Sequence, residues 1–146
     1  NINISTMKTL SKLLVVAGLF MMAFASCKKD DNSSSPSSSM VTQGQWKVTL
    51  FSENGVVETS KFSNYVFTFT SNGTVSAVRS GSTVNGSWSD GNDDSQKKLN
   101  MNFASPVDFT EISDDWHILQ ESSSKIELED VSGGNGGTDL LTFEKI

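Results

Sequence analysis

Cysteine is almost absent from this chain of 146 residues, which contains one cysteine, one histidine and two prolines. A single cysteine excludes an internal disulfide framework and any zinc site built from pairs of cysteines. Only 19% of the residues are charged, and acidic residues outnumber basic residues by 17 to 11. Because an acidic surface repels phosphates, we expect no nucleic-acid partner. Serine, asparagine, threonine and glycine abound instead, which is typical of a secreted all-β protein with many turns.

Catalytic motifs are missing as well. The one histidine, His117, follows Trp116 and is expected on the opposite, outward face of its segment. No serine lies in a G-x-S-x-G motif, and the adjacent carboxylates Asp114 and Asp115 would point to opposite sides of a strand. There is no phosphate-binding loop or nucleotide fingerprint. We therefore expect no enzymatic activity and no cofactor.

Two loops resemble calcium sites only superficially. Residues 90–94, "DGNDD", lack the spaced acids and the terminal glutamate of an EF-hand loop. In "GGNGGTD", residues 133–139, Asp139 comes one position too late for the glycine-rich calcium repeat. Both segments are interpreted as turns, and no metal is expected.

The solitary cysteine, Cys27, ends an apolar N-terminal segment. Met7 is the expected translation start, so residues 1–6 are interpreted as upstream sequence, and Lys8 and Lys12 form a short basic region. The uncharged run 13–26 would span about 21 Å as a helix, which is less than the roughly 30 Å hydrocarbon core of a bilayer. A signal peptide fits this run better than a membrane span does.

The residues around Cys27 account for its presence. Phe24-Ala25-Ser26-Cys27 resembles the lipobox of bacterial lipoproteins, in which small residues precede the cysteine that becomes the lipidated N-terminus. The resemblance implies that the thiol carries diacylglycerol and that the freed amine carries a further acyl chain such as palmitate. Two or more chains give a stable membrane anchor where one does not. An ordinary secretory signal with a chance cysteine is the alternative.

The residues after Cys27 suggest a location. "KKDD", residues 28–31, is similar to the lysine-plus-two-acids export signal of Bacteroidetes surface lipoproteins, and a simple linker is the alternative. The resemblance implies lipid anchoring in the outer membrane, with the protein exposed at the cell surface. "NSSSPSSS", residues 32–39, is a disordered tether without apolar residues. The expected organisation is upstream residues and signal peptide at 1–26, lipidated Cys27 and tether at 27–40, and a domain at 41–146.

The domain alternates apolar and polar residues, the pattern of β-strands with one buried face. Asn72-Gly73 predicts a hairpin turn with positive φ at both central positions, residues 80–82 a second turn, and residues 90–96 a longer polar loop. Residues 105–113 are expected to form a short helix or a lid-like crossover. Eight strands are expected, at 45–50, 65–70, 75–79, 84–88, 98–103, 115–119, 125–130 and 140–146. Their short connections predict an antiparallel up-and-down barrel, with a β-sandwich as the alternative.

A family resemblance supports the barrel. Gly44-Gln45-Trp46 matches the G-x-W motif of lipocalins. With the aromatic strand ending in "SNGT", the second "GSW" and the final "LTFEKI", residues 41–146 resemble the lipocalin-like domains of Bacteroidetes lipoproteins. The resemblance implies that Gly44 and Trp46 close one end of the barrel. Lipocalins also carry an arginine after the last strand, whereas the one arginine here is Arg79, so the resemblance supports the barrel more than a ligand cup.

The alternation predicts an inner face of nineteen residues, eight of them aromatic: Trp46, Val48, Leu50, Tyr65, Phe67, Phe69, Val75, Ala77, Val84, Trp88, Leu99, Met101, Phe103, Trp116, Ile118, Ile126, Leu128, Leu141 and Phe143. An eight-stranded barrel has room for its own side chains or for one small ligand, and so many rings favour a filled core. The expected lining of any pocket is Tyr65, Phe67, Arg79, Met101 and Trp116. Arg79 is either a counter-ion for a carboxylate-bearing apolar ligand or a strand-end residue that reaches water.

Two functions are consistent with these features. The first is a non-enzymatic surface lipoprotein whose lipocalin-like barrel binds a small apolar ligand. The second is a closed-core interaction module that contacts a protein or a glycan at the cell surface. An apolar void of about 300 Å³ or more would favour the first function. Solid packing would direct attention to the loops at 90–96, 105–113 and 132–138.

Overall fold

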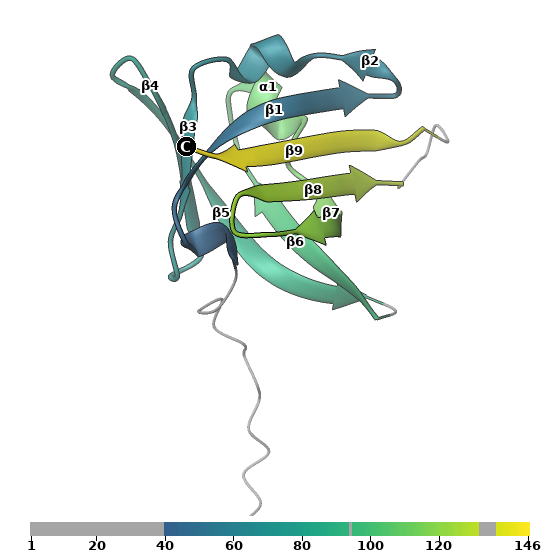
Figure 1. The fold of residues 1–146 in the computed structure, drawn as a ribbon. Coiled ribbons are helices and arrows are strands. Elements are labelled where there is room, and N and C mark those ends of the chain that lie inside the picture. The colour runs from purple at the N-terminus through teal and green to yellow at the C-terminus, as the bar shows by residue number, and fades with distance from the viewer. Residues whose placement is uncertain (1–39, 94, 132–136) are drawn as a thin grey trace, which may run out of the picture. The chain divides into compact units, whose positions relative to one another are not determined.

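The computed structural model describes residues 40–93, 95–131 and 137–146, so Cys27, the signal peptide and the predicted tether lie outside the described residues. Its barrel strands are β1 (Gln45–Glu53), β3 (Val66–Phe69), β4 (Thr74–Arg79), β5 (Ser82–Asp93), β6 (Gln96–Asn102), β7 (Asp115–Glu121), β8 (Lys125–Asp130) and β9 (Asp139–Lys145). Each pairs antiparallel with its neighbours, and β1 closes the barrel by pairing with both β3 and β9 (Figure 1). The predicted eight-stranded up-and-down barrel is confirmed. Among the described residues, no helix is long and apolar enough to span a membrane.

The predicted inner face is largely confirmed, because seventeen of the nineteen residues are buried. The two exceptions, Leu50 and Ile118, are half-buried. In β1 the pairing with β9 shifts by one residue between Val48 and Leu50. This bulge reverses the alternation and buries Phe51 in place of Leu50. A second register shift follows Ile118 in β7.

One turn prediction needs correction, and one further turn was not predicted. At Asn72-Gly73 only Gly73 has a positive φ, of +84°. The Thr70 N–H donates to the Thr74 carbonyl at 2.9 Å, so the loop between them holds three residues, whereas the predicted turn has two. The chain also contains an unpredicted hairpin at Asn54-Gly55, whose φ angles of +49° and +81° fit a two-residue turn. This turn leads into the additional short strand β2 (Val56–Val57), which pairs with β1.

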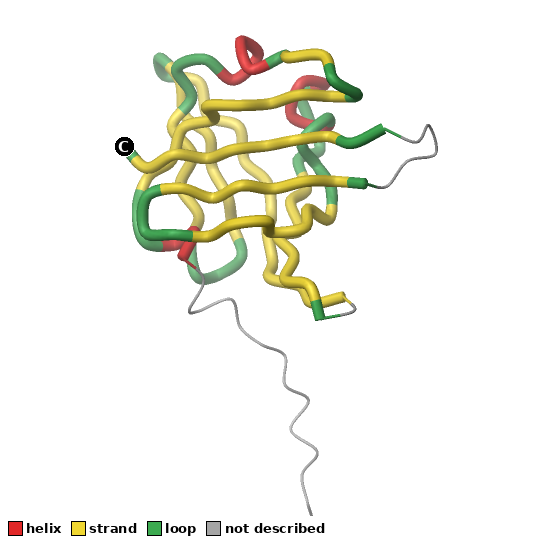
Figure 2. Tube along the Cα trace, turned by 45° about the vertical axis from the view of Figure 1, so that its right-hand side comes forward, coloured by secondary structure: helices red, strands yellow, loops and turns green. Residues whose placement is uncertain are grey.

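The prediction of a polar loop over residues 90–96 was wrong. β5 continues to Asp93 and β6 begins at Gln96, with Asn92 pairing with Lys97. This hairpin extends past the rest of the barrel, so its residues have no core to face and show no apolar alternation (Figure 2). The predicted glycine turn lies mostly at residues 132–136, outside the described residues.

The two ends of the barrel are closed differently. We call the end where β1 begins the Trp46 end. There the Trp46 indole N–H donates to the Val41 carbonyl at 2.7 Å, within the 3₁₀ turn η1 (Met40–Thr42). The Lys145 side chain passes so near Gly44 that a Cβ on this glycine would lie 2.5 Å from Lys145 Cε. Because the end of this lysine side chain is free to move aside, the contact shows only that Lys145, the partner of Trp46, lies beside Gly44.

We call the opposite end the α1 end, after the short helix α1 (Val107–Thr110). This helix confirms the expectation of a short helix within residues 105–113. A second 3₁₀ turn, η2 (Thr59–Phe62), lies beside it (Figure 1). Neither element belongs to the sheet, so both are available to cover the barrel opening.

Candidate functional site

A cluster of buried aromatic rings fills the barrel at the α1 end. Phe109, from α1, is 1% exposed and contacts the rings of four other residues at centroid distances of 5.0–5.9 Å. We call these five residues the Phe109 cluster: Phe62, Tyr65, Phe67, Phe103 and Phe109. Most of the ring pairs are edge-to-face, an arrangement that aromatic quadrupoles favour. The α1 end therefore contains side chains where a ligand-holding barrel would need space.

Local hydrogen bonds hold α1 in this position. The Ser113 hydroxyl donates to the Phe109 carbonyl at 2.8 Å and accepts from the Phe103 N–H at 2.8 Å. Ser113 thus joins the helix to the end of β6. On the same segment, the Trp116 indole donates to the buried Ile112 carbonyl at 3.0 Å.

An ion-pair network joins the two covering elements. The Lys61 ammonium, from η2, contacts the Glu111 carboxylate at 2.6 Å and also contacts Glu58. The hydrogen bonds to Glu111 and then Glu58 raise the pKa of Lys61 well above its ordinary value. Lys61 therefore stays protonated at neutral pH, and η2 is linked to α1 by charge as well as by ring contact.

The structure divides the predicted pocket residues between two parts of the barrel. Tyr65 and Phe67 belong to the Phe109 cluster, and the Arg79 guanidinium lies 4.2 Å above the Tyr65 ring. Met101 and Trp116 are buried on β6 and β7. Arg79 is exposed at the strand end, as its second interpretation predicts. Of the five predicted lining residues, only Arg79 is exposed to solvent, and the other four are buried in the core.

Three carboxylates converge beside the start of β7. Oxygen atoms of Asp114, Asp115 and Asp130 lie within 4.8 Å of one another. Burial and the nearby Asp130 raise the pKa of Asp114. The pKa of Asp115 is lowered, chiefly because the Lys98 ammonium donates to its carboxylate at 2.5 Å. The prediction that Asp114 and Asp115 point to opposite sides was wrong, because β7 begins at Asp115 and Asp114 lies before the strand. The sequence also carried no sign of Asp130, which comes from β8.

Replacing Asp114 with asparagine is expected to raise the melting temperature at pH 7. An acid whose folded-state pKa is raised destabilises the fold above that pKa, and this effect disappears as pH falls to the ordinary value near 3.9. Asparagine keeps the oxygen that accepts the Asp115 N–H at 2.8 Å. Thermal unfolding between pH 3 and pH 8 measures the difference, with exposed Asp90→Asn as control. A gain that does not change with pH would contradict this explanation.

A groove of about 360 Å³ lies on the barrel wall formed by β5 and β6, and its lining is Ser87, Trp88, Ser89, Asn100, Met101 and Asn102. Trp88 and Met101 pair across the two strands and point inward. The serine and asparagine side chains therefore point outward, because successive residues of a strand face opposite sides. Asn100 Nδ2 donates to Ser89 Oγ at 3.2 Å. The groove thus presents hydroxyl and carboxamide groups to solvent.

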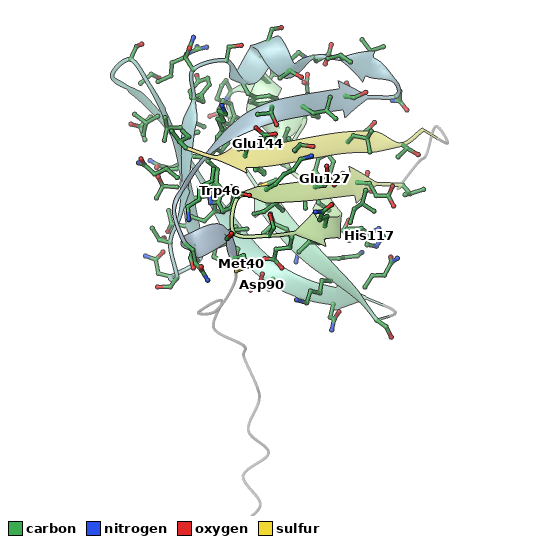
Figure 3. The ribbon with its side chains drawn as sticks, viewed as in Figure 1. Met40, Trp46, Asp90, His117, Glu127 and Glu144 are labelled. Carbon is green, nitrogen blue, oxygen red and sulfur yellow. The ribbon has the colours of Figure 1, made fainter. Side chains whose placement is uncertain are left out.

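The outer face of β8 and β9 is charged. β8 and β9 carry Glu127, Glu129 and Glu144, and Figure 3 shows Glu127 and Glu144 on these strands, whereas the buried Trp46 belongs to the core. His117 is half-buried on β7 and pairs with Glu129. It follows buried Trp116, which agrees with the expectation that it faces outward.

Comparison with known proteins gives one match. The sequence matches no family model and no curated protein. The barrel is similar to the crystal structure of a DUF4847 family protein from Bacteroides vulgatus ATCC 8482. The likeness is one of fold. The two chains are 18% identical, the TM-score is 0.51, and the match covers 73% of this chain and 94% of the other.

Sequence reasoning missed the residues that close the α1 end. Phe62 lies in a polar segment, and Phe109 lies in the segment expected to form a helix or a crossover, so neither was assigned to the inner face of a strand. The groove was missed because the alternating pattern identifies the buried face of a strand and gives no signal for a binding surface on its outer face. The signal that would have found it is the presence of Asn100 and Asn102 within one strand, since asparagine is depleted in strands.

Proposed function

We propose that this protein is a lipid-anchored outer-membrane protein whose closed barrel serves as an interaction module for a protein or a glycan at the cell surface. The observation that best supports the proposal is the filling of the α1 end by the Phe109 cluster. With aromatic rings in the barrel opening, the outer surface becomes the favoured place for contact. No enzymatic role is proposed, since no catalytic motif was found in the sequence.

The lipid anchor rests on the sequence. The lipobox-like residues and Cys27 lie outside the described residues, and the described chain begins with η1 at the Trp46 end. A lipid on Cys27 would therefore attach the domain through the Trp46 end. The wall formed by β5 and β6 and the α1 end would then remain available for partners.

Replacing Cys27 with serine is expected to release the protein from membranes, because serine has no thiol to accept diacylglycerol. Cell fractionation followed by immunodetection measures the distribution, and Ser34→Ala in the same segment serves as the control. The unchanged chain and the control should sediment with the outer membrane. A Cys27→Ser protein that still sediments with membranes would disprove the anchor.

Binding of a small apolar ligand is the second candidate. It is favoured by Arg79, whose exposed guanidinium lies over Tyr65 beside the Phe109 cluster and offers a counter-ion for a carboxylate. Such a ligand would have to displace rings of the cluster before entering the barrel.

Organic extraction and mass spectrometry of the purified protein separate the two candidates. A closed-core module is expected to release no stoichiometric small molecule apart from its own anchor. The Cys27→Ser protein removes that ambiguity. An apolar acid recovered at one equivalent from this variant would establish the ligand-binding function and overturn the closed-core proposal.

A further inference from the structure

We infer that the groove on β5 and β6 binds an uncharged saccharide chain. The inference rests on the proposed function, because it chooses the glycan as the partner of the closed barrel. We call the four outward residues of the groove, Ser87, Ser89, Asn100 and Asn102, the amide–hydroxyl site.

The charge of the site selects a neutral ligand. None of the six lining residues is charged, although the chain carries a net charge of −6. The nearest cation on β6, Lys98, contacts Asp115 at 2.5 Å, so its charge is locally balanced. An anionic ligand would meet the overall negative field without a cation among the lining residues. The nearest carboxylate, Asp115, pairs with Asn100 across the strands, and its charge is balanced by Lys98.

The hydrogen-bonding groups match a polyhydroxylated ligand. Each carboxamide offers two donor hydrogens and an acceptor oxygen, and each serine hydroxyl donates and accepts. The Asn100–Ser89 hydrogen bond uses one donor and fixes the orientation of this amide. Sugar hydroxyls also donate and accept, so adjacent hydroxyls can pair with both edges of one carboxamide.

The residue types are not those that strand formation favours. Ser87 pairs directly with Asn102, the last residue of β6, and Ser89 pairs with Asn100 inside the same strand. Asparagine is depleted in strands, where β-branched and aromatic residues are enriched. Solubility alone does not require serine and asparagine here, because the solvent-facing side of β8 and β9 carries glutamates instead. A departure from local strand preferences is typical of a functional surface.

The surface beside the groove suits a chain better than a single sugar. β4 lies next to β5, and its residues Thr74 and Ser76 pair with Ser87 and Asn85. Uncharged polar residues therefore continue from β5 and β6 onto β4, the third strand. Neighbouring strands lie about 4.8 Å apart, and a ligand that crosses three strands needs several sugar units.

The floor of the groove is rigid. Trp88 and Met101 are buried beneath it, and the Trp88 indole donates to the Thr70 carbonyl at 2.9 Å. A Cβ on the neighbouring Gly86 would lie 2.6 Å from the Asn102 carbonyl oxygen, which shows how closely the two strands pack. A preorganised floor reduces the entropy lost on binding.

The test is an NMR titration of the ¹⁵N-labelled Cys27→Ser chain. The probes are hexasaccharides of glucose, mannose and xylose, with hexagalacturonate as the charged counterpart. We expect at least one neutral probe to shift the backbone amide signals of residues 87–89 and 100–102. Replacing Asn100 or Asn102 with alanine should weaken that binding roughly three- to tenfold, the loss expected for one or two hydrogen bonds. Asn92→Ala, on the same hairpin but outside the groove, should leave the affinity unchanged.

Several results would overturn the inference. It is wrong if no neutral probe shifts these signals, if hexagalacturonate alone does so, or if Asn100→Ala and Asn102→Ala bind as tightly as the parent. Any of these leaves the closed-core function standing, because fractionation and lipid extraction test that separately. Shifts centred on Phe62 and Phe109 would instead place the ligand at the α1 end and overturn both proposals.

Discussion

Phe109→Ala is expected to lower the free energy of unfolding by about 3–5 kcal/mol, the range found when buried phenylalanines are truncated. The side chain is 1% exposed and contacts four other rings, so its removal loses apolar burial and leaves a cavity between η2 and α1. Urea unfolding followed by tryptophan fluorescence measures the loss.

Val107→Ala provides the matched control for Phe109, because Val107 belongs to the same helix but is 71% exposed. Its effect is expected to stay within about 0.5 kcal/mol. A Phe109→Ala protein as stable as this control would show that the ring does not fill the barrel. The new cavity should also admit small apolar molecules, so binding of an apolar dye is expected to appear in Phe109→Ala and not in Val107→Ala.

Trp46→Ala is expected to cost about 3–5 kcal/mol, because Trp46 is fully buried at the other end of the barrel. Trp46→Phe separates packing from hydrogen bonding. It retains a ring but removes the N–H that donates to the Val41 carbonyl at 2.7 Å, and Val41 is also fully buried. The carbonyl left without its donor should cost about 1–3 kcal/mol. Urea unfolding measures both variants.

Trp88→Phe is the control for this hydrogen bond. The Trp88 indole donates to the carbonyl of Thr70, and Thr70 is an exposed residue, so water can replace the lost donor. The loss should therefore be smaller than for Trp46→Phe. Equal losses would show that the bond between Trp46 and η1 contributes no more than ordinary packing does.

The sheet was predictable wherever alternation persisted. Leu99, Met101 and Phe103 are all buried, and the six residues of β8 alternate without a break, so their orientation followed from the two-residue period. The period fails at the β1 bulge, where one extra residue exchanges Leu50 for Phe51. A bulge depends on how β1 meets β9, and these strands lie at opposite ends of the domain sequence.

The candidate site was less predictable, for physical reasons. Phe62 and Phe109 acquire their role only when η2 and α1 fold over the barrel, so their burial is decided by tertiary packing. Asp130 likewise joins Asp114 and Asp115 through the pairing of strands β7 and β8. The hairpin leading to β2 differs, because Asn54-Gly55 is a local turn signal that the sequence itself carries.

The pairing of β1 with β9 sets the order in which this domain can mature. Trp46 pairs with Lys145 and Phe51 with Leu141, contacts that bridge nearly the whole domain. Such distant partners make folding slow, because the chain must close a large loop before gaining their hydrogen bonds. A chain that is synthesised from its N-terminus therefore cannot close the barrel until β9 has been made.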